Sequence, residues 1–127
     1  MNHRVALGWA GALGSSGTIL GALGAHALKV QLAAGGFLDA WGTAVTFQLV
    51  HAAALLGFAG WLRASPGPAG ACARWAVRLW VAGTLLFSGS IYCLALGGPH
   101  VIGPATPLGG LALIAAWVLA AFAANAG

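Results

Sequence analysis

Charge is almost missing from this sequence. Of its 127 residues, five are Lys or Arg and one is acidic, whereas 61% are hydrophobic. The mean hydropathy is +0.94, and soluble domains carry charges on about a quarter of their residues. This shortage of charge excludes a water-soluble globular domain.

Acids and cysteines are also scarce. Asp39 is the one carboxylate side chain, and the two cysteines are Cys72 and Cys93. Hydrolysis by paired carboxylates needs a second acid, and nucleophilic catalysis needs a nucleophile with a base and an orienting group. A metal site needs three or four ligands, and no H-x-x-x-H or C-x-x-C spacing supplies them. We therefore expect no enzyme, no metal centre and no cofactor.

Four long apolar runs are what the sequence does have, at residues 5–25, 42–62, 77–96 and 107–124. Each is close to the roughly 20 residues that a helix needs to cross about 30 Å of hydrocarbon. The sequence predicts an all-α membrane protein with a single domain over residues 1–127. Its four transmembrane helices should form one antiparallel bundle.

The few cations predict the orientation, because Lys and Arg resist translocation across the inner membrane. Four arginines fall on the side of the two termini, and only Lys29 falls on the other side. Both termini are therefore predicted inside. The stretch "ALKVQLAAGGFLDAW" at 27–41 predicts a short helix in the outer interface. Four polar residues are expected at that interface: His26, Lys29, Asp39 and His100.

Glycine and tryptophan residues indicate how the helices pack together and where they are anchored in the membrane. Among the 21 glycines, Gly17 and Gly21 are spaced four apart in the first run, a spacing that favours close helix packing. Five tryptophans lie toward segment ends and are predicted to anchor in the headgroup layer: Trp9, Trp41, Trp61, Trp75 and Trp80.

Gln48 and His51 interrupt the second apolar run near its middle. Three residues apart, they share a helix face, and polar groups at that depth normally face the bundle interior. We expect a polar intramembrane site made of Gln48, His51, Ser15, Ser16 and Ser88, with Ser90 at similar depth. In one interpretation neutral His51 bonds Gln48 and a serine hydroxyl and so sets helix register. In the other, the site holds a ligand, a proton or a cofactor.

Four segments resemble a known family: "GALGAHALK" at 21–29, "WGTAVTFQLVHAAALL" at 41–56, "SGSIYCLAL" at 88–96 and "TPLGGLALIAAWVL" at 106–119. Nearly the whole chain is similar, in matching order, to domain of unknown function 423, a family related to transmembrane protein 256. Its most specific elements are matched by Gly24-Ala25-His26 and Gln48-x-x-His51. The resemblance implies a four-helix protein of the bacterial inner membrane and no known activity.

The sequence is therefore consistent with two functions. The favoured one is an accessory or structural subunit that packs in the lipid bilayer against a larger membrane complex or against copies of itself. The alternative is a binder or conductor of a small ligand or of protons through Gln48 and His51. The net charge of +4 does not indicate nucleic-acid binding, because no cationic cluster with interleaved aromatics is present.

Overall fold

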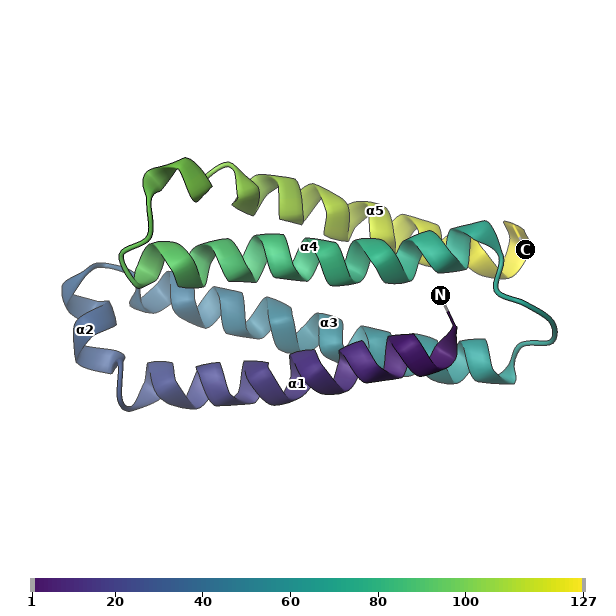
Figure 1. Ribbon diagram of the computed structural model, residues 1–127, viewed down its shortest axis with the longest axis horizontal. Coiled ribbons are helices and arrows are strands. Elements are labelled where there is room, and N and C mark those ends of the chain that lie inside the picture. Colours follow the sequence, from purple (N-terminus) through teal and green to yellow (C-terminus); the bar gives the residue numbers. More distant parts are fainter. Residues whose placement is uncertain (1, 127) are drawn as a thin grey trace.

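The computed structural model describes residues 2–126, and every regular element in that range is helical. Four long helices run along the length of the molecule: α1 (His3–Ala25), α3 (Leu38–Ala64), α4 (Ala71–Ala95) and α5 (Ala105–Ala126) (Figure 1). Two short helices lie in the connections, α2 (Lys29–Ala34) and the 3₁₀ turn η1 (His100–Ile102). Within residues 2–126, four helical segments are long and apolar enough to cross a membrane.

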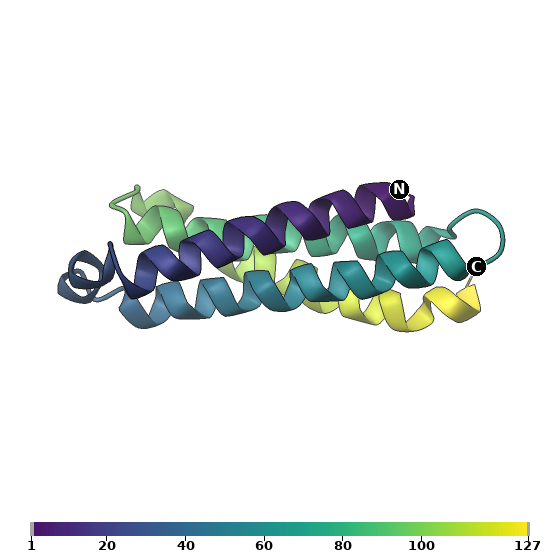
Figure 2. The same ribbon diagram turned by 90° about the horizontal axis from the view of Figure 1, so that it is seen from below.

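The long helices alternate in direction, so each connection returns the chain to the opposite end of the bundle. Both termini and the α3–α4 connection lie at one end, while α2 and η1 lie at the other (Figures 1 and 2). Helix α1 packs on α3, α3 packs on α4, and α4 packs most extensively on α5. The predicted helical bundle is thus confirmed. A short helix does follow the first span, and its place in the outer interface stays a prediction.

Helix ends follow local rules. The Asn2 side chain accepts a hydrogen bond from the Val5 amide at 3.1 Å and so caps the start of α1. Gly36 has φ +77° in the turn before α3, a left-handed conformation that glycine adopts without strain. Helix α4 starts at Ala71, earlier than the apolar run at 77–96 suggested.

Small residues bring the helix backbones close together. A Cβ atom at Gly83 of α4 would lie 2.9 Å from Leu113 of α5, and one at Gly109 would lie 2.8 Å from the Gly83 carbonyl oxygen. On the other side of the bundle, a Cβ atom at Gly17 would lie 2.9 Å from Leu49 Cδ2, and one at Gly21 would lie 3.1 Å from Val45 Cγ1. Without a Cβ atom, the facing side chains can pack directly against the helix backbone.

The prediction of five interfacial tryptophans is wrong for two of them. Trp41 and Trp80 are each only 2% exposed, whereas Trp9, Trp61 and Trp75 remain exposed. Trp41 covers Gly24 and donates from Nε1 to the Leu20 carbonyl oxygen at 2.9 Å. Trp80 packs edge-to-face against two other aromatic rings, Phe58 and Trp117. Both rings are buried because small residues or aromatic edges on neighbouring helices leave room for them.

Candidate functional site

Gln48 is the most connected polar side chain inside the bundle. It lies on α3 and is 4% exposed. Its Nε2 donates to the Leu13 carbonyl oxygen at 3.0 Å and to Ser16 Oγ at 2.8 Å, and its Oε1 accepts from the Tyr92 hydroxyl at 2.7 Å. Both amide hydrogens are therefore used within the protein. One side chain joins α1, α3 and α4.

His51 lies one turn further along α3 and is 5% exposed. Its Nδ1 is 2.6 Å from the Phe47 carbonyl oxygen, and its Nε2 is 3.1 Å from Nε1 of Trp117 on α5. An indole N–H can only donate, so Nε2 must accept and Nδ1 must carry the proton toward Phe47. This hydrogen-bond network assigns a neutral imidazole with the Nδ1–H tautomer.

The expected partners of His51 were wrong, although the ring does point into the bundle. Gln48 and a serine hydroxyl were predicted, but the structure provides a backbone carbonyl and an indole instead. The backbone explains the difference, since the Phe47 carbonyl lies one turn before His51 and within reach of its own ring. Gln48 uses its hydrogen bonds toward α1 and α4, while His51 uses its ring toward α5.

The predicted serines separate into different environments. Ser15 is exposed and donates to the Gly11 carbonyl oxygen at 2.8 Å on its own helix, so its assignment to the polar site is wrong. Adjacent helical residues point about 100° apart, and only Ser16 faces Gln48. Ser88 is buried and donates to the Ala44 carbonyl oxygen at 2.7 Å, which ties α4 to α3. Ser90 shares a hydrogen bond with Thr106 at 2.5 Å and ties α4 to α5.

Sequence reasoning missed Tyr92 and Trp117 as members of this polar site. Tyr92 is the single tyrosine of the chain and lies four residues after Ser88, on the same helix face. Trp117 is the one tryptophan near the middle of an apolar run, a position that the interfacial explanation does not cover. Both signals were available, because an aromatic ring with a polar tip within an apolar run needs a hydrogen-bond partner.

A cavity of about 180 Å³ lies beside Gln48 between α1, α3 and α4. Its polar wall consists of Ser16, Gln48, Thr84, Ser88 and Tyr92. Thr84 is 2% exposed, and its hydroxyl has no hydrogen-bond partner among the residues that the structure describes. Buried hydroxyls in proteins are normally bonded. The cavity beside Gln48 therefore has unused hydrogen-bonding capacity.

The four residues predicted for the outer interface gather at the end of the bundle that carries α2 and η1 (Figure 1). All four side chains are exposed: His26, Lys29, Asp39 and His100. His26 caps the end of α1, and Asp39 lies in the first turn of α3, where a negative charge suits the helix dipole. Across residues 2–126, no three His, Cys, Asp or Glu side chains come close enough to hold a metal ion.

Known proteins similar to this chain are membrane proteins without an assigned activity. A family model described as "Protein of unknown function (DUF423)" matches residues 20–110. UPF0382 membrane protein SSP2132 of Staphylococcus saprophyticus is 36% identical over 94% of this chain and 93% of its own length. UPF0382 membrane protein YwdK of Bacillus subtilis is 37% identical over 83% of each chain. UPF0382 inner membrane protein YgdD of Escherichia coli is 35% identical over 94% of this chain and 88% of its own length. No solved structure is significantly similar.

Proposed function

The chain belongs to the DUF423 family of membrane proteins, and we propose that it is an accessory subunit that packs against a larger membrane complex or against copies of itself. The names of its bacterial relatives and its four apolar helices agree on a multi-pass protein of the inner membrane, as predicted. In this proposal the chain has no catalytic activity of its own. Its contribution is a set of helix surfaces in the bilayer.

The observation that carries the proposal is a groove on the outside of the bundle. It runs between α1 and α3 and has a volume of about 520 Å³. Small and apolar residues line it: Leu7, Ala10, Gly11, Gly14, Thr18, Leu49, Ala52, Ala53 and Leu56. Within a membrane, helices associate through close packing over small residues, because lipid tails supply no hydrophobic driving force between them. A groove floored by glycine and alanine is suited to a further helix.

The pairing of the polar groups supports the same proposal. Gln48 and His51 are bonded to protein groups on their own and neighbouring helices, and so act as fixed links of the scaffold. A proton relay through His51 would have to pass the Trp117 indole, which is a donor only. These contacts favour a rigid packing unit over a conducting path.

Gly11 offers a test of the accessory role. A Cβ atom there meets nothing within 4 Å, so Gly11→Leu should leave the bundle intact and fill the groove. Purification from native membranes in mild detergent, followed by mass spectrometry, should recover a stoichiometric partner or a homo-oligomer with the wild type and much less with Gly11→Leu. Gly57→Leu is the matched control, because Gly57 is exposed on α3, has equal space and does not line the groove. A monomer with no crosslinked partner in nanodiscs would contradict the proposal.

The alternative function, binding or conduction of a small ligand or protons, is favoured by the cavity beside Gln48 and the unpaired Thr84 hydroxyl. Purified protein in liposomes distinguishes conduction from the accessory role. A conductor should pass protons or a small polar solute, with Gln48→Leu abolishing the flux. The accessory role predicts flux equal to that of empty liposomes for both proteins.

A further inference from the structure

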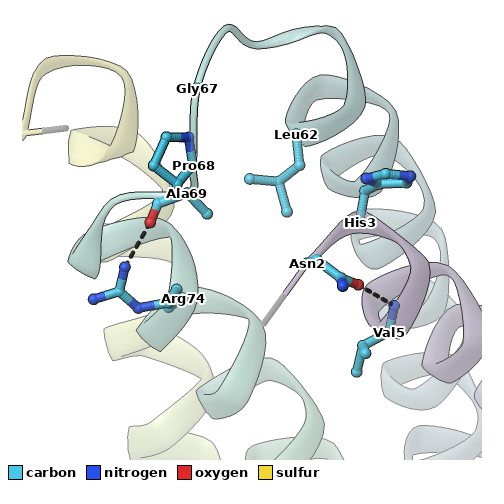
Figure 3. A pocket seen from close by; sticks show the side chains of 8 residues that line it. All are labelled: Asn2, His3, Val5, Leu62, Gly67, Pro68, Ala69 and Arg74. Atoms are coloured by element: carbon cyan, nitrogen blue, oxygen red, sulfur yellow. Dashed lines mark hydrogen bonds between the residues drawn. The ribbon is translucent and has the colours of Figure 1, made fainter.

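A third pocket lies at the end of the bundle that carries both termini, far along the helices from the polar site. It has a volume of about 430 Å³ and opens between the start of α1 and the α3–α4 connection (Figure 3). Eight residues line it: Asn2, His3, Val5, Leu62, Gly67, Pro68, Ala69 and Arg74. Three helices start or stop beside it, because α1 begins at His3, α3 ends at Ala64 and α4 begins at Ala71. When the helices span the bilayer, the pocket lies at the depth of the lipid headgroups.

Arg74 supplies a positioned cation in this pocket. Its Nη1 donates to the Ala69 carbonyl oxygen at 2.5 Å, which holds the guanidinium against the connection. This is the one hydrogen bond of the Arg74 side chain within residues 2–126, and a guanidinium has five N–H donors. Arg74 and His3 line opposite sides of the pocket, and each is half-buried (Figure 3). The N–H groups of Arg74 that bond no protein group are therefore the donors that this pocket offers.

Apart from the Asn2 side chain, which caps α1, the remaining walls are apolar or backbone. Val5 and Leu62 contribute aliphatic side chains, and Gly67, Pro68 and Ala69 contribute the connection. The pocket thus combines hydrogen-bond donors with an aliphatic wall. A molecule that carries a phosphate on a hydrocarbon body matches this combination.

The distribution of charge favours an anion at this end. Four arginines lie here, Arg4 in α1, Arg63 at the end of α3, and Arg74 and Arg78 in the first turns of α4. Lys29 and Asp39, the two other charged residues, lie at the opposite end. Basic pockets between transmembrane helices attract anionic lipid headgroups, and arginine pairs with phosphate through two parallel hydrogen bonds.

We propose that this pocket binds the phosphate of an anionic phospholipid. The Arg74 guanidinium donates to the phosphate oxygens, and the acyl chains descend past Val5 and Leu62. The site is independent of the accessory role and of the polar groups around Gln48.

Native mass spectrometry of the protein released from nanodiscs tests the site. The nanodiscs contain equal amounts of phosphatidylglycerol and phosphatidylcholine, and the measured quantity is the ratio of the two lipids retained. Wild-type protein should retain phosphatidylglycerol preferentially, and Arg74→Gln should reduce that preference about tenfold, the effect of losing one charge-assisted contact. Arg78→Gln is the matched control: it removes the same charge one turn along α4, where Arg78 lies 5.0 Å from the centre of the Trp75 ring.

His3→Glu keeps the test decisive if Arg74→Gln unfolds, because an acid in the first turn of α1 suits the helix dipole. It also lowers the charge by one and should reduce the preference for phosphatidylglycerol. If Arg78→Gln lowered the preference for phosphatidylglycerol as much as the two pocket variants do, the effect would come from overall charge, and the proposal would be wrong. Equal retention of both lipids by the wild type would also overturn it. Inorganic phosphate is the other ligand that these donors could bind. Displacement of the lipid by millimolar phosphate would assign the pocket to free phosphate and overturn the lipid as its ligand.

Discussion

Trp117 donates a hydrogen bond from its indole Nε1 to Nε2 of His51 at 3.1 Å, and this bond joins the middle of α5 to the middle of α3. The rings also meet edge-to-face, with their centroids 5.9 Å apart. Helix α5 otherwise packs mainly on α4. The His51–Trp117 pair therefore links the α1–α3 pair of helices to the α4–α5 pair, which lie side by side in Figure 1.

Replacing His51 with leucine should weaken the link to α5. We expect His51→Leu to lower the free energy of unfolding by about 1 to 2 kcal/mol, the upper range for hydrogen bonds within membranes. Titration with a denaturing detergent, followed by circular dichroism, measures the change. A double-mutant cycle with Trp117→Phe isolates the pair, and the effects of the two changes should not be additive. Additive effects would mean that the indole and the imidazole do not stabilise one another.

Removing the Gln48 amide should have a larger effect than removing one of its partners. Gln48→Leu loses three hydrogen bonds that join three helices, whereas Tyr92→Phe loses one of them. At about 0.6 kcal/mol for an average membrane hydrogen bond, we expect losses of about 2 and about 0.6 kcal/mol. The same detergent titration compares them, with the exposed Gln31→Leu as a control. Equal losses in Gln48→Leu and Tyr92→Phe would contradict the three-helix role of Gln48.

Filling the contact between α1 and α3 should disrupt the bundle. Gly17→Leu places a side chain where even a Cβ atom would lie 2.9 Å from Leu49 and 3.3 Å from Gln48. Overpacking of this kind costs about 1 to 3 kcal/mol, and here it also displaces Gln48. Thermal unfolding in detergent should show a lower midpoint for Gly17→Leu, and no change for Gly57→Leu in open space. Unchanged stability in Gly17→Leu would show that α1 and α3 can separate without loss.

The four-to-one division of cations between the bundle ends predicts that both termini are cytoplasmic. A green fluorescent protein fused after the C-terminus should fluoresce in a bacterial host. Alkaline phosphatase inserted in the α4–α5 connection after Gly98 should be active in the periplasm. Phosphatase activity from a C-terminal fusion would show that the predicted orientation is wrong and that the Arg74 pocket lies on the periplasmic side.

The sequence by itself determined the class of the protein and the number of its spans, because length and apolarity alone decide which segments can cross a membrane. It also indicated that Gln48 and His51 face inward, since polar groups at that depth avoid lipid. Gly17 and Gly21 were identifiable in the same way from their spacing.

Only the tertiary structure decided which side of each helix faces a neighbour. In a soluble helix, polar residues mark the solvent side, but these helices are apolar on nearly every side, and lipid does not distinguish one apolar face from another. Rotation about each axis therefore depends on the shapes of the helices that meet. That is why Ser15 turned outward, why Trp41 and Trp80 were buried, and why the partner of His51 came from Trp117, 66 residues further along the chain.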